Sequence, residues 1–479
     1  MIYRYNALTA LWLILMSGCV PAIKNNAEKI KEVKIPVHLI TSNSAVTNGD
    51  NESKTNEWWR IFKNNELEDL LKLAQQDNPS ISEARSRLEI AQAELRQSKS
   101  SQLPRVDADA SITRLHYSNN GDHGIYNGET HTVGVADPLI INYRTDFFGK
   151  DKEVIASAVA HSEVHKALLK GSLITLRQSV IKTYFALITA DDLVRTQLEI
   201  IQLAKEIENI NIIALQVGLQ PASAVLPIRL YLDQSNLSLS LINQRKSALQ
   251  YALSHLLGRG PDKVIEPQQN RLHIPKQLPI PETINLDSIS RRPDIQAALW
   301  KIYYAAHMEK VAQKNFYPNI NIRALLGFNS LRLANLIDSG SLTYAVGPAL
   351  SLPIFNHNEL KSRFDAAAAA YDAAVFAYNN SVLNAAKEVA TNLENLENTK
   401  SILESQSLIL ENRDAYAASI QAEFNNGISD KSPYLEAQIM NKQAYADYLQ
   451  SRLNWLCAIT DMATALDGEL QETENDIQN

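Results

Sequence analysis

Few residues in this sequence have the type and spacing that chemistry requires. The chain holds two cysteines, Cys19 and Cys457, and ten scattered histidines, without a CxxC or HExxH motif. His161 and His165 stand four residues apart on a predicted helix and could face a metal ion, but no third ligand accompanies them, so a solvated helix face is the alternative interpretation. No carboxylate pair, nucleophile–base arrangement or phosphate-binding loop stands in a convincing context. We therefore expect no catalysis, no cofactor and no metal site.

Cys19 is the residue with the clearest chemical role. One positive charge, an apolar run of roughly ten residues and the small pair Ser17–Gly18 precede it, which is the layout of a signal peptide. A cysteine at that point resembles the bacterial lipobox, so we expect residues 1–18 to be removed and Cys19 to carry a covalent lipid. Val20 follows it, and the Asp that retains lipoproteins in the inner membrane is absent. The alternatives are an ordinary signal peptide cut elsewhere or an uncleaved anchor.

Composition limits the classes of function that remain. Hydrophobic residues make up 45% of the 479 positions and charged residues 21%, so the chain can bury a core. The net charge is −7 and no run of Lys or Arg stands out, which argues against a nucleic-acid partner. Beyond the signal no apolar run approaches ~18 residues, so any membrane crossing would have to use strands.

The chain reads as one pattern used twice. Pro79 and Pro293 each open a predicted helix and stand 214 positions apart, and Pro104 and Pro318 end those helices at the same offset. We expect an internal tandem repeat of helix, strand, strand, long helix, reversal and returning helix. The expected organisation is a lipidated N-terminus and linker at 19–55, a first repeat at 56–258, a proline-rich linker at 259–290, a second repeat at 291–470 and a polar tail at 471–479.

Alternating apolar and polar residues predict two pairs of strands, at about 105–147 and about 319–353. Within 320–328, for example, Ile, Ile, Ala, Leu and Phe share one face. A half-buried sheet in a soluble protein would give the same alternation. Four strands of ~10 residues suit a tilted membrane crossing but are too few to close a barrel, so several chains would have to pool their strands. Three copies would give twelve.

Two predicted helices are unusually long. From Asp151 to Gln216 the only breaker is Gly171, and from Glu359 to Asn425 there is neither Pro nor Gly. About 66 residues at 1.5 Å each give a helix of about 100 Å. Gly218 and Gly427 then mark reversals, after which a Ser or Asp such as Asp430 can cap the returning helix. We expect Cys457 to be a small buried residue on the second returning helix.

Several short motifs, taken together, resemble the TolC/OprM-type outer-membrane efflux lipoproteins over almost the whole mature chain. The matching stretches are Trp58–Trp59, Asp146–Lys150, Tyr184–Leu187, Asp191–Leu193, Leu256–Gly258, Arg291–Ile295, Phe316–Pro318, Gly347–Pro348, Pro353–Phe355 and Glu388–Val389. The resemblance implies a mainly α-helical fold with a membrane β-barrel: a homotrimer with a twelve-stranded barrel in the outer membrane and a periplasmic α-barrel of long antiparallel helices. It also implies a periplasmic adaptor and an RND-type or ABC-type inner-membrane pump as partners.

The implied function is a passive trans-periplasmic conduit for drugs or other small molecules, lipid-anchored in the outer membrane. A duct for protein secretion and a periplasmic helical scaffold without a pore are the alternatives. The resemblance places Gly218 and Gly427 at the periplasmic end, where the adaptor binds. It makes Glu436, nine residues past Gly427, a candidate pore gate, although a solvated helix residue would look the same. Phe424 stands where some members have a latching Tyr, so that latch cannot be carried over.

Overall fold

The computed structural model describes residues 57–267, 275, 289–353 and 355–466. These residues form two compact units. The first holds 87–166 and 297–379, and the second holds 57–86, 167–296 and 380–466, in each case within the described residues. Cys19, the predicted linker at 19–55, most of the segment 259–290 and the tail 471–479 lie outside the described residues.

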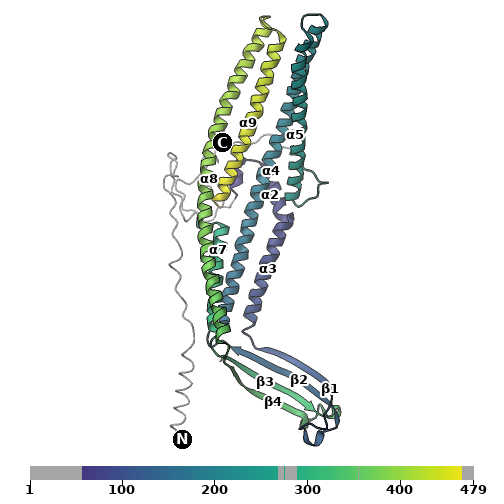
Figure 1. Cartoon of the computed structure of the whole chain (residues 1–479), viewed down its shortest axis with the longest axis vertical. Helices are drawn as coiled ribbons and strands as arrows, with labels where there is room; N and C mark the ends of the chain where they lie inside the picture. Colours follow the sequence, from purple (N-terminus) through teal and green to yellow (C-terminus); the bar gives the residue numbers. More distant parts are fainter. Residues whose placement is uncertain (1–56, 268–274, 276–288, 354, 467–479) are drawn as a thin grey trace. The chain divides into compact units, whose positions relative to one another are not determined.

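The first unit contains a four-stranded antiparallel sheet (Figure 1). Its strands are β1 (Arg105–His116), β2 (Thr130–Thr145), β3 (Asn319–Ser330) and β4 (Leu342–Ser351), hydrogen-bonded in the order β1-β2-β3-β4. They lie in the two segments in which alternation predicts strands. Short 3₁₀ turns occupy the two strand connections: η4 (Gly124–Tyr126), η6 (Leu333–Asn335) and η7 (Ser339–Ser341).

A β-bulge at Pro138 explains why β2 alternates poorly in sequence. Asp137 and Pro138 together oppose Gly327 of β3, and Pro138 and Leu139 together oppose Ala108 of β1, so the register shifts here in both ladders. Proline cannot donate a ladder hydrogen bond, so a bulge is one of the few places in a sheet that accepts it. Gly327 faces this point, and a Cβ on it would lie 1.9 Å from Asp137 Oδ1. The bulge reverses the parity of β2, so odd-numbered residues on one side of it share a face with even-numbered residues on the other.

The long helices form as predicted. Helix α4 spans Lys150–Gln216, with 67 residues, and α8 spans His357–Asn425, with 69. Each contributes to both units. The shorter helices are α2 (Asn65–Asp77), α3 (Pro79–Ser100) and α7 (Pro293–Lys314), and a 3₁₀ helix, η3 (Trp58–Phe62), precedes them. None of the helices in the described part of the chain has a stretch apolar enough and long enough to cross a lipid bilayer.

The returning helices are α5 (Leu226–Leu256), preceded by the 3₁₀ turn η5 (Ala222–Ala224), and α9 (Lys431–Ala465). Asp430 occupies the N-cap position of α9, but its side chain makes no capping hydrogen bond, and neither does that of Val225 before α5. The predicted side-chain capping by Asp430 is therefore wrong. Pro227 has no N–H group, but this costs nothing in the first turn of α5, since first-turn N–H groups have no intrahelical acceptor.

Four helices lie side by side in the second unit, in the order α5, α4, α9, α8 (Figure 1). An apolar cluster centred on Ile200, Ala204 and Ile207 of α4 packs against Leu232 of α5 and Leu435 of α9. Ion pairs add to it: Lys246 Nζ lies 2.6 Å from Asp191 Oδ1, joining α5 to α4, and the largely buried Arg452 lies 3.1 Å from Asp192, joining α9 to α4. Asn441 and Asp414 are hydrogen-bonded between α9 and α8.

Arg292 ties three helices together in the same unit. Its guanidinium donates to Asp294 at the start of α7, to Glu388 of α8 at 2.7 Å and to the carbonyl of Ala465 at the end of α9. Burial alone would lower the pKa of Arg292, but the two carboxylates outweigh it and raise that pKa. The Arg–Pro–Asp motif noted in the sequence is thus a structural tie.

Cys457 lies on α9 as expected, but its side chain is half-buried rather than fully buried. Burial raises the pKa of its thiol to about 11. Such a thiol is protonated at neutral pH and is a poor nucleophile.

Candidate functional site

The pairing register gathers the apolar side chains of all four strands onto one face of the sheet. Residues paired directly across a ladder share a face. One such row runs Val106, Ile141, Ala324 and Val346, and the rows beside it contain Leu139, Leu326, Tyr344, Tyr143 and Ile322. Val346 is 78% and Tyr344 76% exposed in the single chain. A continuous exposed apolar face of this size needs an apolar partner or medium to cover it.

The opposite face of the sheet is mixed, with apolar residues such as Ile140 and Leu325, and it holds most of the charged residues of the strands. It carries Asp107, Asp109 and Asp137 together with Arg144 and Arg323, since these residues pair within the other parity of the ladders. Asp109 stands directly opposite Asp137. The sheet therefore separates an apolar face from a water-compatible one.

Both outer edges of the sheet lack a partner strand within the described residues. β1 pairs only with β2, and β4 pairs only with β3. Open edges present rows of unpaired N–H and C=O groups, which soluble sheets blunt and which lipid cannot satisfy. The two edges are therefore places where further strands could be added.

The two edge helices of the second unit expose apolar stripes. On α5 the leucines at 226, 230, 237 and 241 are exposed, and they lie on the side of the helix opposite the buried Leu232. On α8, Ile402, Ile409 and Tyr416 are exposed at seven-residue spacing. Such spacing is that of a helix–helix seam, so each edge helix is built to pack against another helix.

Both helical reversals use the same backbone motif. Gly218 has φ +78° and Gly427 has φ +73°, the left-handed conformation that glycine adopts without steric cost. Leu219 N donates to Ala214 O at 2.8 Å and Gly218 N to Leu215 O at 3.1 Å. The corresponding bonds after α8 run from Ile428 N to Glu423 O and from Gly427 N to Phe424 O. These are the paired bonds of a Schellman motif, which satisfies the last carbonyls of each long helix.

The tips of the reversals expose apolar side chains. Leu219 is 79% exposed and Ile428 75% exposed. Phe424 stacks on Tyr434 of α9, with ring centroids 5.5 Å apart and planes within 6°. The residue that replaces the family's latching Tyr therefore packs within its own helical hairpin.

Glu436 lies in the second turn of α9 with an exposed side chain, between the buried Leu435 and Ala437. Its carboxylate has no hydrogen-bond or ion-pair partner among the described residues. The side chain is thus free to face an aqueous space.

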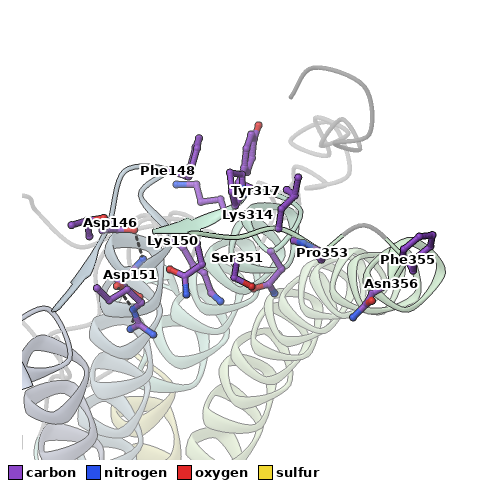
Figure 2. Close-up of a pocket in the computed structure, with 16 residues that line it drawn as sticks. Asp146, Phe148, Lys150, Asp151, Lys314, Tyr317, Ser351, Pro353, Phe355 and Asn356 are labelled. Carbon is purple, nitrogen blue, oxygen red and sulfur yellow. Dashed lines mark hydrogen bonds and ion pairs between the residues drawn. The ribbon is translucent and has the colours of Figure 1, made fainter. Parts of the chain in front are cut away.

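A pocket of about 530 Å³ marks the junction of strands and helices in the first unit (Figure 2). Arg144 at the end of β2 pairs with Asp151 of α4 at 2.8 Å, and Asp146 accepts from the backbone N–H groups of Asp151 and Lys152. Phe148 and Tyr317 stack with centroids 4.9 Å apart. Most charges that line this pocket are paired with one another, so its contacts mainly join strands to helices.

Glu153 sits just behind that junction. His307 Nδ1 lies 2.7 Å from one carboxylate oxygen, and Lys314 donates to the other at 3.0 Å. Burial raises the pKa of Glu153, but the bonds to His307 and Lys314 outweigh burial and lower it below its ordinary value. An ionised Glu153 therefore links α4 to α7 across the neutral pH range.

His161 and His165 meet edge to face, with ring centroids 4.8 Å apart, and His161 Nδ1 lies 3.4 Å from Glu94. Burial, then the charges of His161 and Arg87, lower the pKa of His165. Among the described residues no group of three or more His, Cys, Asp or Glu side chains is placed to hold a metal ion.

Comparison with known proteins decides the family. The model of the family described as outer membrane efflux protein matches residues 70–259 and 287–468, more than half of the chain. The chain belongs to the outer membrane efflux protein family. The sequence-based identification and the outer-membrane location that it implies are thereby confirmed.

Individual efflux proteins are similar over most of their length. The chain is 25% identical over 365 residues to the fusaric acid resistance protein FusA of Burkholderia cepacia, covering 74% of this chain and 68% of FusA. It is 24% identical to the multidrug resistance outer membrane protein MdtQ of Escherichia coli O157:H7, covering 95% and 96% of the two chains. The crystal structure of the CmeC outer membrane channel of Campylobacter jejuni has the same fold, with a TM-score of 0.83 at 22% identity, covering 95% and 96%.

For this efflux protein, sequence reasoning located the reversals but missed the exposed seams of α5 and α8, and the role of Glu436 as a gate stays a prediction. The signal was present, since the intervals of four and seven residues between the α5 leucines are those of a coiled-coil seam. It was not decisive, because leucines at the same spacing equally form a core within one chain.

The reversal glycines of the efflux protein can be tested by local hydrogen exchange. An L-residue in the left-handed region costs about 1–2 kcal/mol, so Gly218→Ala should speed exchange of the amides of residues 218–219 by about 5- to 30-fold. Gly427→Ala should act in the same way on residues 427–428. Gly340→Ala is the matched control, since its Cβ meets nothing within 4 Å and its φ is not left-handed. Unchanged exchange at both reversals would contradict the Schellman assignment.

Proposed function

We propose that this efflux protein is the outer-membrane subunit of a tripartite export system and that three copies form one continuous duct. The observation that carries the proposal is the amphipathic four-strand sheet with two open edges. Three such sheets joined edge to edge, β4 of one copy to β1 of the next, would give a twelve-stranded barrel with its apolar face towards lipid and its charged face towards water. No edge would then remain unpaired.

The helical layer supports the same closure. In the order α5, α4, α9, α8 the two edge helices are those with exposed apolar stripes. Placing α5 of one copy against α8 of its neighbour would bury both stripes and complete an α-barrel of antiparallel helices. The two halves of the chain have the same order of elements: a helix, two strands and two helices. This order is α3, β1, β2, α4, α5 in the first half and α7, β3, β4, α8, α9 in the second, which favours a tandem repeat as their origin.

We further propose that the reversals lie at the periplasmic end of the duct. The exposed Leu219 and Ile428 beside Gly218 and Gly427 offer an apolar contact to a periplasmic adaptor, which would connect the duct to an inner-membrane pump of the RND or ABC type. The names of FusA and MdtQ refer to resistance to fusaric acid and to several drugs. Drugs or other small molecules are accordingly the proposed cargo, and passage through the duct is passive, with no catalytic step.

The oligomer is the first test of this function. We expect the detergent-extracted protein to be a homotrimer by light scattering, and the double variant Leu230→Glu, Leu237→Glu to weaken it strongly, since two carboxylates would be placed in the α5 seam. Leu198→Glu on the central helix α4 is the matched control, because that leucine is 49% exposed but lies outside both seams. A folded, monodisperse monomer of the unmodified protein would overturn the proposal.

Glu436 is proposed to line the constriction at the periplasmic end. Three copies of an unpaired carboxylate around one axis would repel one another and attract cations. Glu436→Gln should therefore reduce cation selectivity and block by multivalent cations in planar-bilayer recordings. Glu411→Gln, an exposed residue of α8 remote from the reversal, should leave both unchanged. Equal selectivity and block in the two variants would remove Glu436 from the gate.

Cys19 is proposed to carry a fatty-acylated lipid that anchors the N-terminus to the outer membrane. Metabolic labelling with a radioactive fatty acid should mark the unmodified protein, and Cys19→Ser should abolish the label. Cys457→Ser is the control, because the only other cysteine is half-buried on α9 and should not be acylated. A label that survives in Cys19→Ser would disprove the anchor.

A further inference from the structure

The apolar face of the sheet carries one charged side chain, Arg114. It lies on the same face of β1 as Val106, Ala110 and Ile112, and it pairs with Thr132 of β2. All the remaining positions of this face in the described strands hold an apolar residue, a glycine, a residue with a hydroxyl group or, at position 116, a histidine. A guanidinium on an otherwise apolar face calls for a specific environment.

Arg114 has no partner in the part of the chain that the structure describes. Its side chain is exposed, and no hydrogen bond or ion pair to it is formed. His116, two residues further along, is engaged with Thr130 through Nδ1 and Oγ1 at 2.9 Å. The guanidinium is thus available to a ligand outside the chain.

The height of Arg114 on the sheet corresponds to a membrane surface. Arg114 pairs with Thr132 of β2, so it lies at the position of Thr132 along that strand. The aromatic residue of β2 nearest the helices is Tyr143. With one residue taken up by the bulge, the two levels are about 34 Å apart along the strand at ~3.4 Å per residue. A strand tilt of about 35–45° reduces this to a height of about 24–28 Å, close to the ~25 Å apolar band of outer-membrane barrels. Arg114 and Tyr143 therefore bracket such a band.

The positions of Arg114 and Tyr143 also indicate which leaflet of the membrane lies beside Arg114. Tyr143 lies at the end of the sheet where the strands continue into helices, and Arg114 lies at the end where loops join the strands. Under the proposed function the helices are periplasmic, so the loop end faces the cell exterior. This step rests on the proposed function. Arg114 is then level with the headgroups of the outer leaflet.

The β3–β4 connection adds to the same patch. A Cβ on Gly134 would lie 3.1 Å from Leu336 and 3.3 Å from Leu333, so these leucines cover the apolar face between β1 and β3. Ser330, which shares that face, bonds both the N–H and the carbonyl of Arg332, whose exposed side chain also has no partner among the described residues. Two guanidiniums without a partner among the described residues thus lie at the loop end of the same sheet, near exposed apolar side chains.

We propose that Arg114, with Arg332 as a second basic group at the same end of the sheet, binds the phosphate of a phosphorylated glycolipid of the outer leaflet, of the lipid A type. Guanidinium is always charged and matches phosphate with two parallel hydrogen bonds. Basic residues beside a membrane-spanning segment bind lipid headgroups in this way. Leu333 and Leu336 would contact the upper part of the acyl chains. The site would hold one lipid on each protomer.

The test uses the full-length protein, purified in detergent and examined by native mass spectrometry with three probes: bisphosphorylated lipid A, dephosphorylated lipid A and phosphatidylglycerol. The unmodified protein should retain bisphosphorylated lipid A in preference to the other two. Arg114→Gln should weaken that binding about 10-fold, and Arg114→Lys, which keeps the charge but not the planar fork, should weaken it less. Arg323→Gln is the matched control, an exposed and unpartnered arginine on the opposite face of the same sheet.

Three outcomes would overturn the proposal: equal binding by Arg114→Gln and the unmodified protein, equal loss in Arg114→Gln and Arg323→Gln, or equal binding of phosphorylated and dephosphorylated lipid A. Equal binding of phosphatidylglycerol would transfer the site to phospholipids and reject the glycolipid. Planar-bilayer conductance separates this proposal from the duct. Conducting channels with no effect of Arg114→Gln on lipid binding would reject the lipid site alone, whereas Arg114-dependent lipid binding by a protein that forms no channels would reject the duct.

Discussion

The outer edges of β1 and β4 present backbone N–H and C=O groups that no strand in the described residues pairs, and the larger architecture depends on how these groups are satisfied. In water, solvent could bond them. Beside an apolar face as continuous as that of this sheet, the surrounding medium offers no such bonds. The single chain therefore combines an exposed apolar face with two edges of unpaired backbone groups, and the proposed closure with other copies would satisfy both.

The bulge at Pro138 is what keeps that apolar face continuous. Without the extra residue in β2, the residues from Thr130 to Ala136 would fall on the opposite parity from Leu139, Ile141 and Tyr143. Gly327 leaves room for Asp137 at the same point, so the bulge is accommodated from both sides. A proline and a glycine that look like strand breakers in sequence thus preserve one apolar surface over the full length of the strands.

The helices of the second unit, like the strands of the sheet, leave the outer sides of their two edge elements unpacked within one chain. Within one chain, α4 and α9 are held by an apolar cluster and by ion pairs such as Arg452–Asp192, while α5 and α8 bury one side only. The stripes left exposed on α5 and α8 lie on the two edge helices of the layer, as the unpaired strands lie at the two edges of the sheet. Both units are therefore left open at two edges within the described residues.

Sequence alone determined the features that depend on near neighbours along the chain. The scarcity of Pro and Gly set the lengths of α4 and α8, alternation located the strands, and Gly218 and Gly427 marked the reversals, because helix continuity, strand periodicity and a left-handed turn are each settled within a few residues. Tertiary structure decided what depends on contacts between different elements: the parity change at Pro138, the order of the helices that leaves the α5 leucines at an edge, the half-exposure of Cys457 and the face on which Arg114 stands. These follow from pairing register and from which helix packs beside which, and periodicity cannot supply either, since a strand or an amphipathic helix presents the same pattern to any partner that covers its apolar side.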